Sequence, residues 1–464
     1  MEADEAYRIG PGEPGESYLN IERVVAVAKK AGAEGVHPGY GFLAENPDFA
    51  LACEEAGFAF IGPSSKVLRK VANKLESKAV VSGAGVPAIP GPTKEIASSE
   101  EAGQEARRIG YPVLVKAVHG GGGRGMRIVK GPKALKSSLE RARAEAKTSF
   151  GRDELYLEKY LQKPRHIEVQ ILAGRRGRVV HLGERECSLQ RRYQKILEET
   201  PSPALNDRER KRLVSLALRV AEATRYENAG TIEFVRSQDG RFYYMETNKR
   251  IQVEHLITEM VTGVDIVEEQ LRIASGERLG LSQNEVEFSG AAINCRVNAE
   301  DPAKGFAPTP GTVTRFIAPG GPGVRVDSAL YDGCPVPEYY DSLIAKVAAS
   351  GRNRQEAIER ARIAIDETII EGVKTTIPLH ETLLEKPEFV KGEYHTQLLD
   401  TLILSEELDP SLNREEAAAI YLSLKRSIES AGPRLTLSTV SRNRWRAGLQ
   451  QAPEKRPAFY VEGT

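Results

Sequence analysis

The sequence has little of what marks a secreted, membrane-spanning or nucleic-acid-binding protein. It holds four cysteines, which are scattered along the chain without the spacing of a metal site. No apolar run approaches the length of a transmembrane helix, and the N-terminus lacks a secretory charged-then-apolar pattern. Its 65 basic residues balance its 65 acidic residues, which argues against bulk electrostatic capture of nucleic acid. We therefore expect a reduced, cytoplasmic protein with no nucleic-acid partner and no membrane association.

Length and composition predict a globular protein of several domains. At 464 residues, 40% hydrophobic and 28% charged, the chain is too long for one compact core. Its first 62 residues alternate helix and strand patterns, which is typical of a parallel α/β sheet, and strand patterns dominate from Val286 onward. We expect an α/β domain at 1–72, a second domain at 73–285 with a lid at about 89–161, a β-rich domain at 286–402, and a helical extension with a disordered tail at 403–464.

The stretch from Glu246 to His255 concentrates polar chemistry. Every even position from 246 to 254 is polar or charged, in the order Glu, Asn, Arg, Gln, Glu. Because side chains alternate faces in an extended segment, one face offers two carboxylates, two amides and a guanidinium. A solvated edge strand would show the same alternation, so the pattern alone leaves both interpretations open.

The preceding residues favour a site over an edge strand. Two β-rich runs flank Asp239-Gly240, which is a strong signal for a two-residue hairpin loop. With that loop, Glu233 lies directly opposite Glu246. Two like charges facing each other across a ladder are destabilising, and the hairpin has no obvious basic neighbour for them. A divalent cation between the carboxylates would remove the conflict, and magnesium is usually bound in this way.

A glycine run follows the strand predicted at Tyr111–Val118. Its four consecutive glycines, Gly120 to Gly123, let backbone amides approach a polyanion. The run lacks a Gly-Lys-Ser/Thr sequence, and the apolar residues after it predict a strand rather than a helix. The pattern fits a glycine-rich hairpin flap over phosphates, with Lys116 as the phosphate cation. A glycine run alone is a weak signal, and the basic residue just before it strengthens the prediction.

Three further segments are ambiguous from their residues alone. His166–Leu172 alternates like a strand with one polar face, where a lone histidine is more often structural than catalytic. The polar, basic stretch Cys187–Lys195 lies between predicted strands and could be a solvated loop. Arg296 lies in an otherwise buried-looking strand, so its guanidinium must be paired or must face a cleft.

Long helices are predicted at three places. Asn206–Thr224 is amphipathic, and its inward positions are Leu213, Leu216, Ala217 and Val220. Thr258–Ala274 is predicted as one helix that buries Met260, Ile266 and Leu271. Asn413–Ser430 is predicted as a helix that ends at a Gly-Pro sequence, before the tail.

Glu246–His255 resembles the Glu-x-Asn-x-Arg-x-Gln-Val-Glu-His signature of biotin carboxylases, which are ATP-grasp enzymes. Further motifs match this family in order along about 1–402, namely His37–Asn46, Lys116 with its glycine run, Glu158–Leu161, Arg191–Lys195 and Cys295–Pro302. The resemblance implies a mixed α/β and α+β chain: an ATP-grasp fold with a Rossmann-like N-terminal domain, a mobile glycine-rich lid and a β-rich C-terminal domain. The family's opening Asn-Arg-Gly-Glu-Ile-Ala motif is absent, so we expect a truncated N-terminal domain.

The resemblance also implies a role for each matching residue. The ATP-binding set would be Lys74, Lys116, Gly120, Gly121, Gly122, Gly123, Glu158, Lys159, Tyr160, Leu161, His166, Gln190, Tyr193, Glu233 and Glu246. Magnesium or manganese would be held by Glu233, Glu246 and Asn248. Bicarbonate and biotin would be bound by Lys195, Arg250, Gln252, Val253, Glu254 and Arg296. Glu254 would be the general base on bicarbonate, and Arg250 or Arg296 would stabilise the enolate of biotin, with Lys195 completing the catalytic set.

The implied reaction needs partners. No methionine of the chain precedes a lysine, so the Met-Lys-Met motif that carries biotin is missing. The resemblance therefore implies a carboxyltransferase subunit and a separate biotin carboxyl carrier protein, together with a possible homodimer. Two alternatives remain: another ATP-grasp ligase, such as one that forms carbamoyl phosphate, and a non-catalytic scaffold protein disabled by its shortened N-terminus. The first would lack the Gln252–His255 end of the signature.

Overall fold

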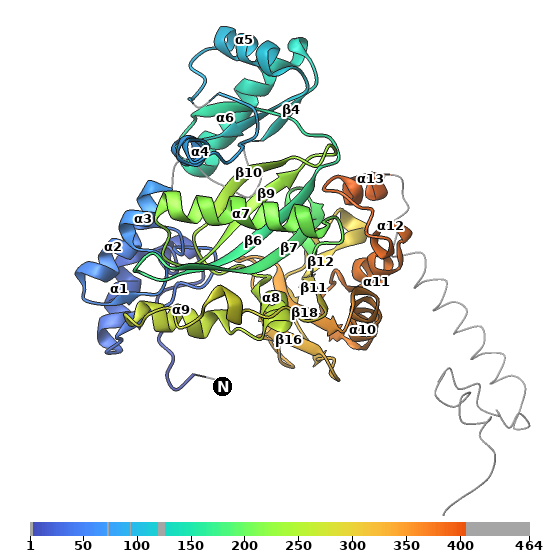
Figure 1. Ribbon diagram of the computed structural model, residues 1–464. Coiled ribbons are helices and arrows are strands. Elements are labelled where there is room, and N and C mark those ends of the chain that lie inside the picture. Colours follow the sequence, from blue (N-terminus) through green and yellow to red (C-terminus); the bar gives the residue numbers. More distant parts are fainter. Residues whose placement is uncertain (1–2, 72–73, 93, 119–125, 405–464) are drawn as a thin grey trace, which may run out of the picture. The chain divides into compact units, whose positions relative to one another are not determined.

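The computed structural model describes residues 3–71, 74–92, 94–118 and 126–404, and Figure 1 shows how their elements are arranged. The predicted glycine loop Gly120–Gly123, the predicted helix Asn413–Ser430 and the predicted tail lie outside these residues. No helix in the described part of the chain combines the length and the apolar character that a membrane crossing needs.

The N-terminal elements form a small parallel α/β unit, as the alternation of patterns predicted. They are α1 (Ile21–Lys30), β1 (Gly35–Val36), α2 (Pro47–Glu55), β2 (Ala59–Phe60) and α3 (Ser65–Lys70). The two strands pair in parallel. Asn20 and Asn46 cap α1 and α2, because their side-chain oxygens accept backbone amides of the first turn. Phe49, Phe60 and Leu68 form the centre of the core of this unit.

The lid predicted at about 89–161 contains a three-stranded antiparallel sheet of order β4-β3-β5. Its elements are α5 (Ser99–Ile109), β3 (Val113–Ala117), β4 (Arg127–Val129), α6 (Leu135–Phe150) and β5 (Leu155–Lys159). The strand expected after the glycine run is confirmed as β4. Ala106 of α5 and Ala142 of α6 join one apolar cluster with Val115 of β3. Figure 1 shows this group of elements beyond β10, with α4 (Lys74–Gly83) between the two.

A large antiparallel sheet positions the candidate site. Its strand order is β10-β9-β6-β7-β8-β11-β18-β16, so it continues from the second predicted domain into the third. The strands are β6 (Arg165–Ala173), β7 (Val179–Arg191), β8 (Gln194–Thr200), β9 (Asn228–Arg236), β10 (Phe242–Asn248), β11 (Ala291–Asn298), β16 (Val324–Ser328) and β18 (Leu343–Gly351). The strand predicted at 166–172 is part of β6, and its polar face, formed by His166, Glu168 and Gln170, is buried.

Several helices of the described chain pack against this sheet. Figure 1 shows α7 (Asp207–Thr224) running across β6 and β7, and α10 (Arg354–Glu367) packing beside β18. The predicted inward positions of α7 are confirmed, because Leu213, Leu216, Ala217 and Val220 all belong to the core cluster beneath it. Asn206 and Glu209 form a capping box at its start.

The helix predicted at Thr258–Ala274 is two helices, α8 (His255–Thr262) and α9 (Ile266–Ala274). Gly263 ends α8 with a positive φ of 68°, and Asp265 caps α9. The chain therefore changes direction inside the predicted helix, and the buried face does not continue through the break although the apolar spacing in the sequence does. Ile266 is buried as predicted, whereas Leu271 is 47% exposed.

Glu259 ties α8 to its neighbours, which leads to a prediction on acid stability. Its carboxylate accepts the amide of Ile266 at 3.0 Å and pairs with Arg325 at 2.6 Å and His255 at 3.0 Å. Burial alone would raise the pKa of Glu259, but these partners lower it from 4.5 to about 2. Since the folded-state pKa lies below the unfolded value, this stabilisation is full above about pH 4.5 and is lost as the pH falls toward 2.

We therefore expect Glu259→Gln to lower the free energy of unfolding by about 1–3 kcal/mol at pH 7. The loss should shrink as the pH approaches 3, because the wild-type carboxylate then begins to lose the same contribution. Urea denaturation at both pH values measures the difference. An equal loss at pH 7 and pH 3 would contradict the assignment.

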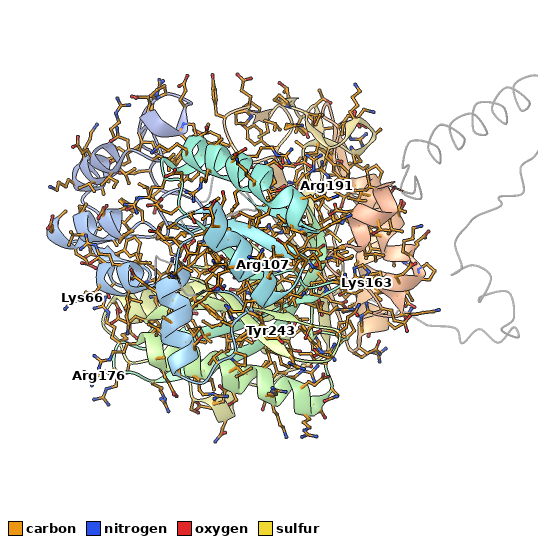
Figure 2. The ribbon with its side chains drawn as sticks, turned by 90° about the horizontal axis from the view of Figure 1, so that it is seen from above. Lys66, Arg107, Lys163, Arg176, Arg191 and Tyr243 are labelled. Atoms are coloured by element: carbon orange, nitrogen blue, oxygen red, sulfur yellow. The ribbon has the colours of Figure 1, made fainter. Side chains whose placement is uncertain are left out.

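The remaining elements surround the C-terminal half. They are the strands β12 (Glu300–Asp301), β13 (Ala307–Pro308), β14 (Gly311–Thr312), β15 (Arg315–Ile317), β17 (Pro335–Val336) and β19 (Ile369–Glu371), and the helices α11 (Ile377–Glu385), α12 (Pro387–Val390) and α13 (Leu398–Leu404). Short 3-10 turns lie at Pro14–Glu16, Pro132–Ala134, Gln283–Glu285 and Pro302–Lys304. Figure 2 shows charged side chains such as Lys66 and Arg176 pointing outward from the ribbon.

Candidate active site

The β9–β10 hairpin differs from its predicted turn but keeps the predicted carboxylate pair. Next to the turn, the pairing of the two strands is shifted by one residue from the predicted register. Gly240 has a φ of 78°, which is typical of a three-residue loop that ends in a left-handed residue. A bulge at Met245 then moves the ladder by one residue. As a result, Glu246 lies opposite Glu233, as predicted.

A third carboxylate joins this pair. Glu168 of β6 pairs with Glu233 on its other side, so three carboxylates form a row across β6, β9 and β10. The predicted repulsion is offset by cations from other elements. The Nζ atom of Lys195 on β8 lies 2.5 Å from Glu168 and 2.9 Å from Glu233. Lys74 of α4 lies 3.5 Å from Glu246.

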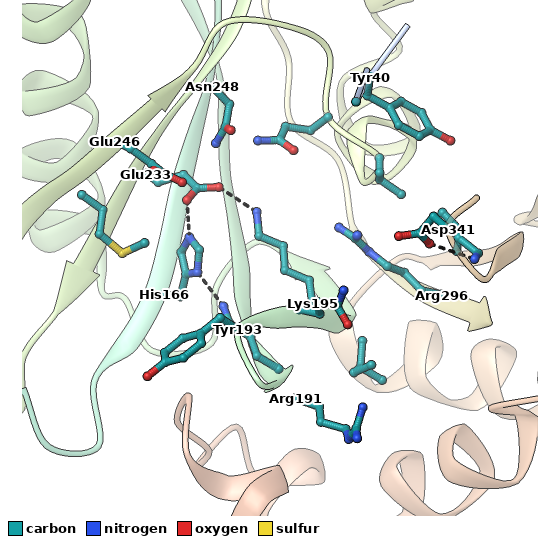
Figure 3. A pocket seen from close by; sticks show the side chains of 18 of the residues that line it. Tyr40, His166, Arg191, Tyr193, Lys195, Glu233, Glu246, Asn248, Arg296 and Asp341 are labelled. Atoms are coloured by element: carbon teal, nitrogen blue, oxygen red, sulfur yellow. Dashed lines mark hydrogen bonds and ion pairs between the residues drawn. The ribbon is translucent and has the colours of Figure 1, made fainter. Parts of the chain in front are cut away.

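His166 completes the surroundings of Glu233. Figure 3 shows Glu233 between Lys195 and His166, whose Nε2 atom is 3.2 Å from the carboxylate. Burial alone would raise the pKa of Glu233, but Lys195 and His166 hold it well below its ordinary value. The Nδ1 atom of His166 faces the side-chain amide of Gln190 at 2.6 Å. The structure therefore brings together four predicted site residues from separate segments of the sequence.

Glu254 is a fully buried carboxylate just before the first residue of α8. One of its oxygens lies 2.6 Å from Lys195 and the other 2.8 Å from Arg296. Burial alone would raise the pKa of Glu254, but Lys195, Arg296 and then Arg185 hold it well below its ordinary value. This carboxylate is therefore ionised at neutral pH and is positioned by two cations from different strands.

Arg296 was predicted to be either paired or facing a cleft, and it is both: its guanidinium is paired, and it lines a cavity. Its Nε atom donates to Glu198 of β8, a fully buried carboxylate that also accepts the amide of Asn294 at 2.7 Å. Burial disfavours the Arg296 cation, yet Glu198 and Glu254 raise its pKa above the ordinary value. Together these two carboxylates fix the plane of the guanidinium at the cavity wall.

Four of the five even positions of the 246–254 stretch, Glu246, Asn248, Arg250 and Gln252, line one cavity, although β10 ends at Asn248. Arg250 donates to Gln252 at 3.1 Å and to Asn248 at 3.2 Å, and Val253 follows at the wall. The cavity has a volume of about 530 Å³, and Lys195 and Arg296 also line it. Among the described residues, the buried Nε2 atom of Gln252 has no hydrogen-bond partner, so it could donate to a bound anion.

A second cavity of about 290 Å³ adjoins the first, and Lys116, His166, Gln190, Tyr193, Met126 and Met245 line both. Its other walls come from the lid, at Glu158 to Leu161, and from Gln397 and Asp400 near the end of the described chain. The mostly apolar, partly open space suits a flat aromatic base, with Lys116 at the junction where phosphates would lie. Lys159 donates to the carbonyl of Gly110 at 2.8 Å, so its ammonium contacts the lid backbone.

The stretch Cys187–Lys195 is a tight hairpin rather than a solvated loop. β7 ends at Arg191 and β8 begins at Gln194, and the two residues between the strands have positive φ values of 48° and 68°. This pattern is typical of a type I′ turn. Arg191 donates to the carbonyl of Gly305 and lies 4.0 Å from the ring of Phe306, so the turn is held at the cavity edge.

Several contributing residues were not singled out from the sequence. Glu168, Arg185, Glu198 and Lys78 are all buried ionisable groups of the site or its supports. Arg185 is fully buried and donates to Glu168 at 2.6 Å, while Lys78 pairs with Glu158. For Glu168, Arg185 and Glu198 the available signal was a charged residue inside a strand, the same signal that singled out Arg296, whereas Lys78 lies on helix α4.

The donor set fits a hard divalent cation. Glu233, Glu246 and Asn248 place two carboxylates and an amide oxygen on one face of β9 and β10. These are oxygen ligands of the kind that magnesium and manganese accept. The adjoining cavity gives the remaining positions access to water or to a phosphate.

Comparison with known proteins agrees with this arrangement. Family models match for the biotin carboxylase N-terminal domain at 1–68, the carbamoyl-phosphate synthase L chain ATP-binding domain at 73–282, and the biotin carboxylase C-terminal domain at 294–401. The chain is 50% identical to "Biotin carboxylase 1" of Bacillus subtilis over 86% of this chain and 89% of that protein. It is also 50% identical to the "2-oxoglutarate carboxylase small subunit" of Hydrogenobacter thermophilus, over 86% of this chain and 84% of that one.

A solved structure is similar along the same length. It is the biotin carboxylase domain dimer of the Hydrogenobacter thermophilus 2-oxoglutarate carboxylase, in complex with MgADP, ADP and bicarbonate. The match has a TM-score of 0.84 and 49% sequence identity, and covers 86% of this chain and 88% of that one.

Proposed function

This chain belongs to the biotin carboxylase family, and we propose that it carboxylates biotin on a separate carrier protein, using ATP and bicarbonate. The observation that carries the proposal is Glu254, which is ionised between Lys195 and Arg296. These two cations line the same cavity as Arg250 and Gln252. This arrangement places one base in direct contact with two cations of a cavity that further anion-binding groups also line.

The anion-binding groups suit bicarbonate. Arg250 presents a planar fork, Gln252 a free amide donor, and Lys195 a compact ammonium. Glu254 would take the bicarbonate proton, which requires that its contact with Lys195 loosen when the anion enters. A bicarbonate oxygen would then attack the γ-phosphorus of ATP, the bond to the β-phosphate oxygen would break, and carboxyphosphate and ADP would form.

Carboxyphosphate would release carbon dioxide and phosphate beside the same groups. The phosphate would take the N1 proton of biotin, and the resulting enolate would attack carbon dioxide to give carboxybiotin. Arg296 is fixed by Glu198 and Glu254 at the cavity wall, so its guanidinium is preorganised for the developing enolate charge. Arg250 is the second candidate for this role.

The second cavity would hold the nucleotide. Glu158 to Leu161 would border adenine and ribose, while Lys74, Lys116 and His166 would face the phosphates, with Gln190 and Tyr193 at the junction. The family resemblance adds the Gly120–Gly123 run, which lies outside the described residues. Glu233, Glu246 and Asn248 would hold magnesium or manganese, which would neutralise phosphate charge. Lys74 contacts Glu246, and it would move to the phosphate as the metal takes over that carboxylate.

The domain boundaries, the partners and the cellular location are part of the same proposal. We divide the chain into an N-terminal domain at 1–72, an ATP-grasp domain at 73–285, a C-terminal domain at 286–402 and an extension at 403–464. The proposed partners are a carboxyltransferase subunit and a biotin carboxyl carrier, with a second copy of this chain as in the dimeric relative. The free cysteines of the described chain support a cytoplasmic setting.

The direct test is ATP hydrolysis by the purified full chain. Hydrolysis should depend on bicarbonate and should rise when free biotin is added. A chelator should abolish it, and added magnesium or manganese should restore it, because the metal neutralises the phosphates. Well-folded protein that shows no stimulation by bicarbonate and biotin would contradict the proposal and favour a scaffold. Hydrolysis that responds to ammonia but not to biotin would instead indicate a carbamoyl-phosphate-forming ligase.

A further inference from the structure

Helix α4 lies between the large sheet and the lid sheet and contacts both through charged side chains (Figure 1). Lys74 and Lys78 are one helical turn apart, so they lie on the same face. Lys74 pairs with Glu246 of β10, whereas Lys78 pairs with Glu158 of β5. Between them, Ser77 shares a hydrogen bond with the hydroxyl of Tyr244 at 2.7 Å. The helix is therefore anchored on the large sheet while it contacts the lid.

Glu158 is held between two lysines. One oxygen contacts Lys78, and the other lies 3.1 Å from the Nζ atom of Lys116 on the neighbouring strand β3. Glu158 is 1% exposed, Lys78 is 3% exposed and Lys116 is 9% exposed, so the three charges are largely shielded from water. The carboxylate therefore faces the lysines, although residue 158 also borders the nucleotide cavity.

This arrangement creates a conflict for nucleotide binding, which rests on the function proposed above. Lys116 lies at the junction of the two cavities, where it would have to turn from Glu158 to a phosphate. A buried carboxylate that loses its only cation is strongly destabilised. Without a second counter-charge, binding a phosphate through Lys116 would leave Glu158 uncompensated.

We propose that Lys78 is a positioning residue that keeps Glu158 neutralised and so releases Lys116 to bind the nucleotide phosphates. Lys78 contacts one oxygen of the carboxylate while Lys116 lies beside the other, and Lys78 does not line either cavity. Its ammonium also lies 4.8 Å from the centre of the Tyr156 ring, which fixes its direction. Burial and then the like charges of Lys116 and Lys74 lower the pKa of Lys78. Glu158 is the carboxylate that its ammonium contacts.

The test is a double-mutant cycle read by MgADP binding to the full chain in calorimetry. Lys78→Met should weaken binding on the order of tenfold, because Lys116 is then retained by Glu158. Lys78→Met combined with Glu158→Gln should recover most of this loss, since the neutral amide no longer holds Lys116. In ATP hydrolysis, the single variant should raise the KM for ATP with little change in kcat. Lys66→Met, an exposed lysine on α3, is the matched control and should bind as the wild type does.

Each outcome separates this inference from the proposed function. Wild-type affinity in Lys78→Met, or a double variant that binds as weakly as the single one, would overturn it. Wild-type protein that fails to bind MgADP would instead refute the proposed function. If Lys78→Met does not fold, the double variant, in which neither buried charge remains, is compared with Glu158→Gln alone. Equal affinities of these two are expected, whereas weaker binding by the double variant would show that Lys78 acts on the nucleotide by another route.

Discussion

Glu254→Gln is expected to lower kcat for biotin carboxylation by about a hundred- to ten-thousandfold, the range that a general base contributes. Glutamine keeps the shape of the side chain but cannot take the bicarbonate proton. It also removes the anion between Lys195 and Arg296, which lie 2.6 and 2.8 Å from Glu254. The measurement is steady-state turnover with free biotin as the acceptor.

The pH profile sharpens this expectation. Because the pKa of Glu254 is held well below its ordinary value, the basic form is present throughout the neutral range. In the wild type, protonation of Glu254 should lower kcat/KM only at acidic pH. That fall should occur below the pH at which an ordinary glutamate becomes protonated. The variant should lose that fall together with the turnover. Glu268→Gln, which changes an exposed carboxylate paired with Arg272, is the matched control, and equal activities of the two variants would refute the assignment.

Arg185→Met is expected to lower the free energy of unfolding by about 3–5 kcal/mol, the cost of breaking a buried ion pair from one side. Arg185 is fully buried and donates to Glu168 at 2.6 Å, to Gln170 at 2.8 Å, to Thr258 at 2.9 Å and to Thr231 at 3.1 Å. Methionine is shorter and has no N–H donor, so these four acceptors would lose the Arg185 donor and Glu168 would keep only Lys195 as its cation within the described chain. Urea denaturation followed by circular dichroism provides the measurement.

The Arg185→Met substitution should also disturb the active site. Arg185 joins β6 and β9 to α8, and Glu254 is the residue just before that helix. Arg176→Met, on the exposed turn between β6 and β7 (Figure 2), should change stability by no more than about 0.5 kcal/mol. Adding Glu168→Gln to Arg185→Met should recover part of the stability, because one uncompensated charge is removed. Similar denaturation midpoints for Arg185→Met and Arg176→Met would contradict this account.

In the β9–β10 hairpin, the predicted pairing of Glu233 with Glu246 is correct, although the predicted turn is not. The Asp-Gly signal placed the turn, and the alternation placed Glu246 on the same face as Asn248 and Arg250. The predicted two-residue loop was wrong by one residue, and the bulge at Met245 restored the register. Two local shifts that cancel leave no clear mark in a period-two pattern, so the sequence could not reveal them.

The helix break after Gly263 had a similar cause. Gly263 and Asp265 were visible as a stop and a cap, but apolar residues continued on both sides at helix-like spacing. The outward position of Leu271 follows from the new direction of α9. The helical spacing of apolar residues assumes one straight helix axis, so it cannot show that the chain changes direction between α8 and α9.

By itself the sequence determined the motifs: the polar face from Glu246 to Glu254, Lys116 before a glycine run, and Arg296 in a buried strand. These follow from local periodicity and composition, which act over a few residues. The tertiary structure alone decided which charges meet. Lys195 contacts Glu168, Glu233 and Glu254 because β6, β8, β9 and the start of α8 converge there, over separations of 27 to 59 residues. Glu246 was predicted to need a metal against Glu233; in the fold, Lys74, Lys195 and His166 already offset those charges, because burial requires every ionised group to find a partner.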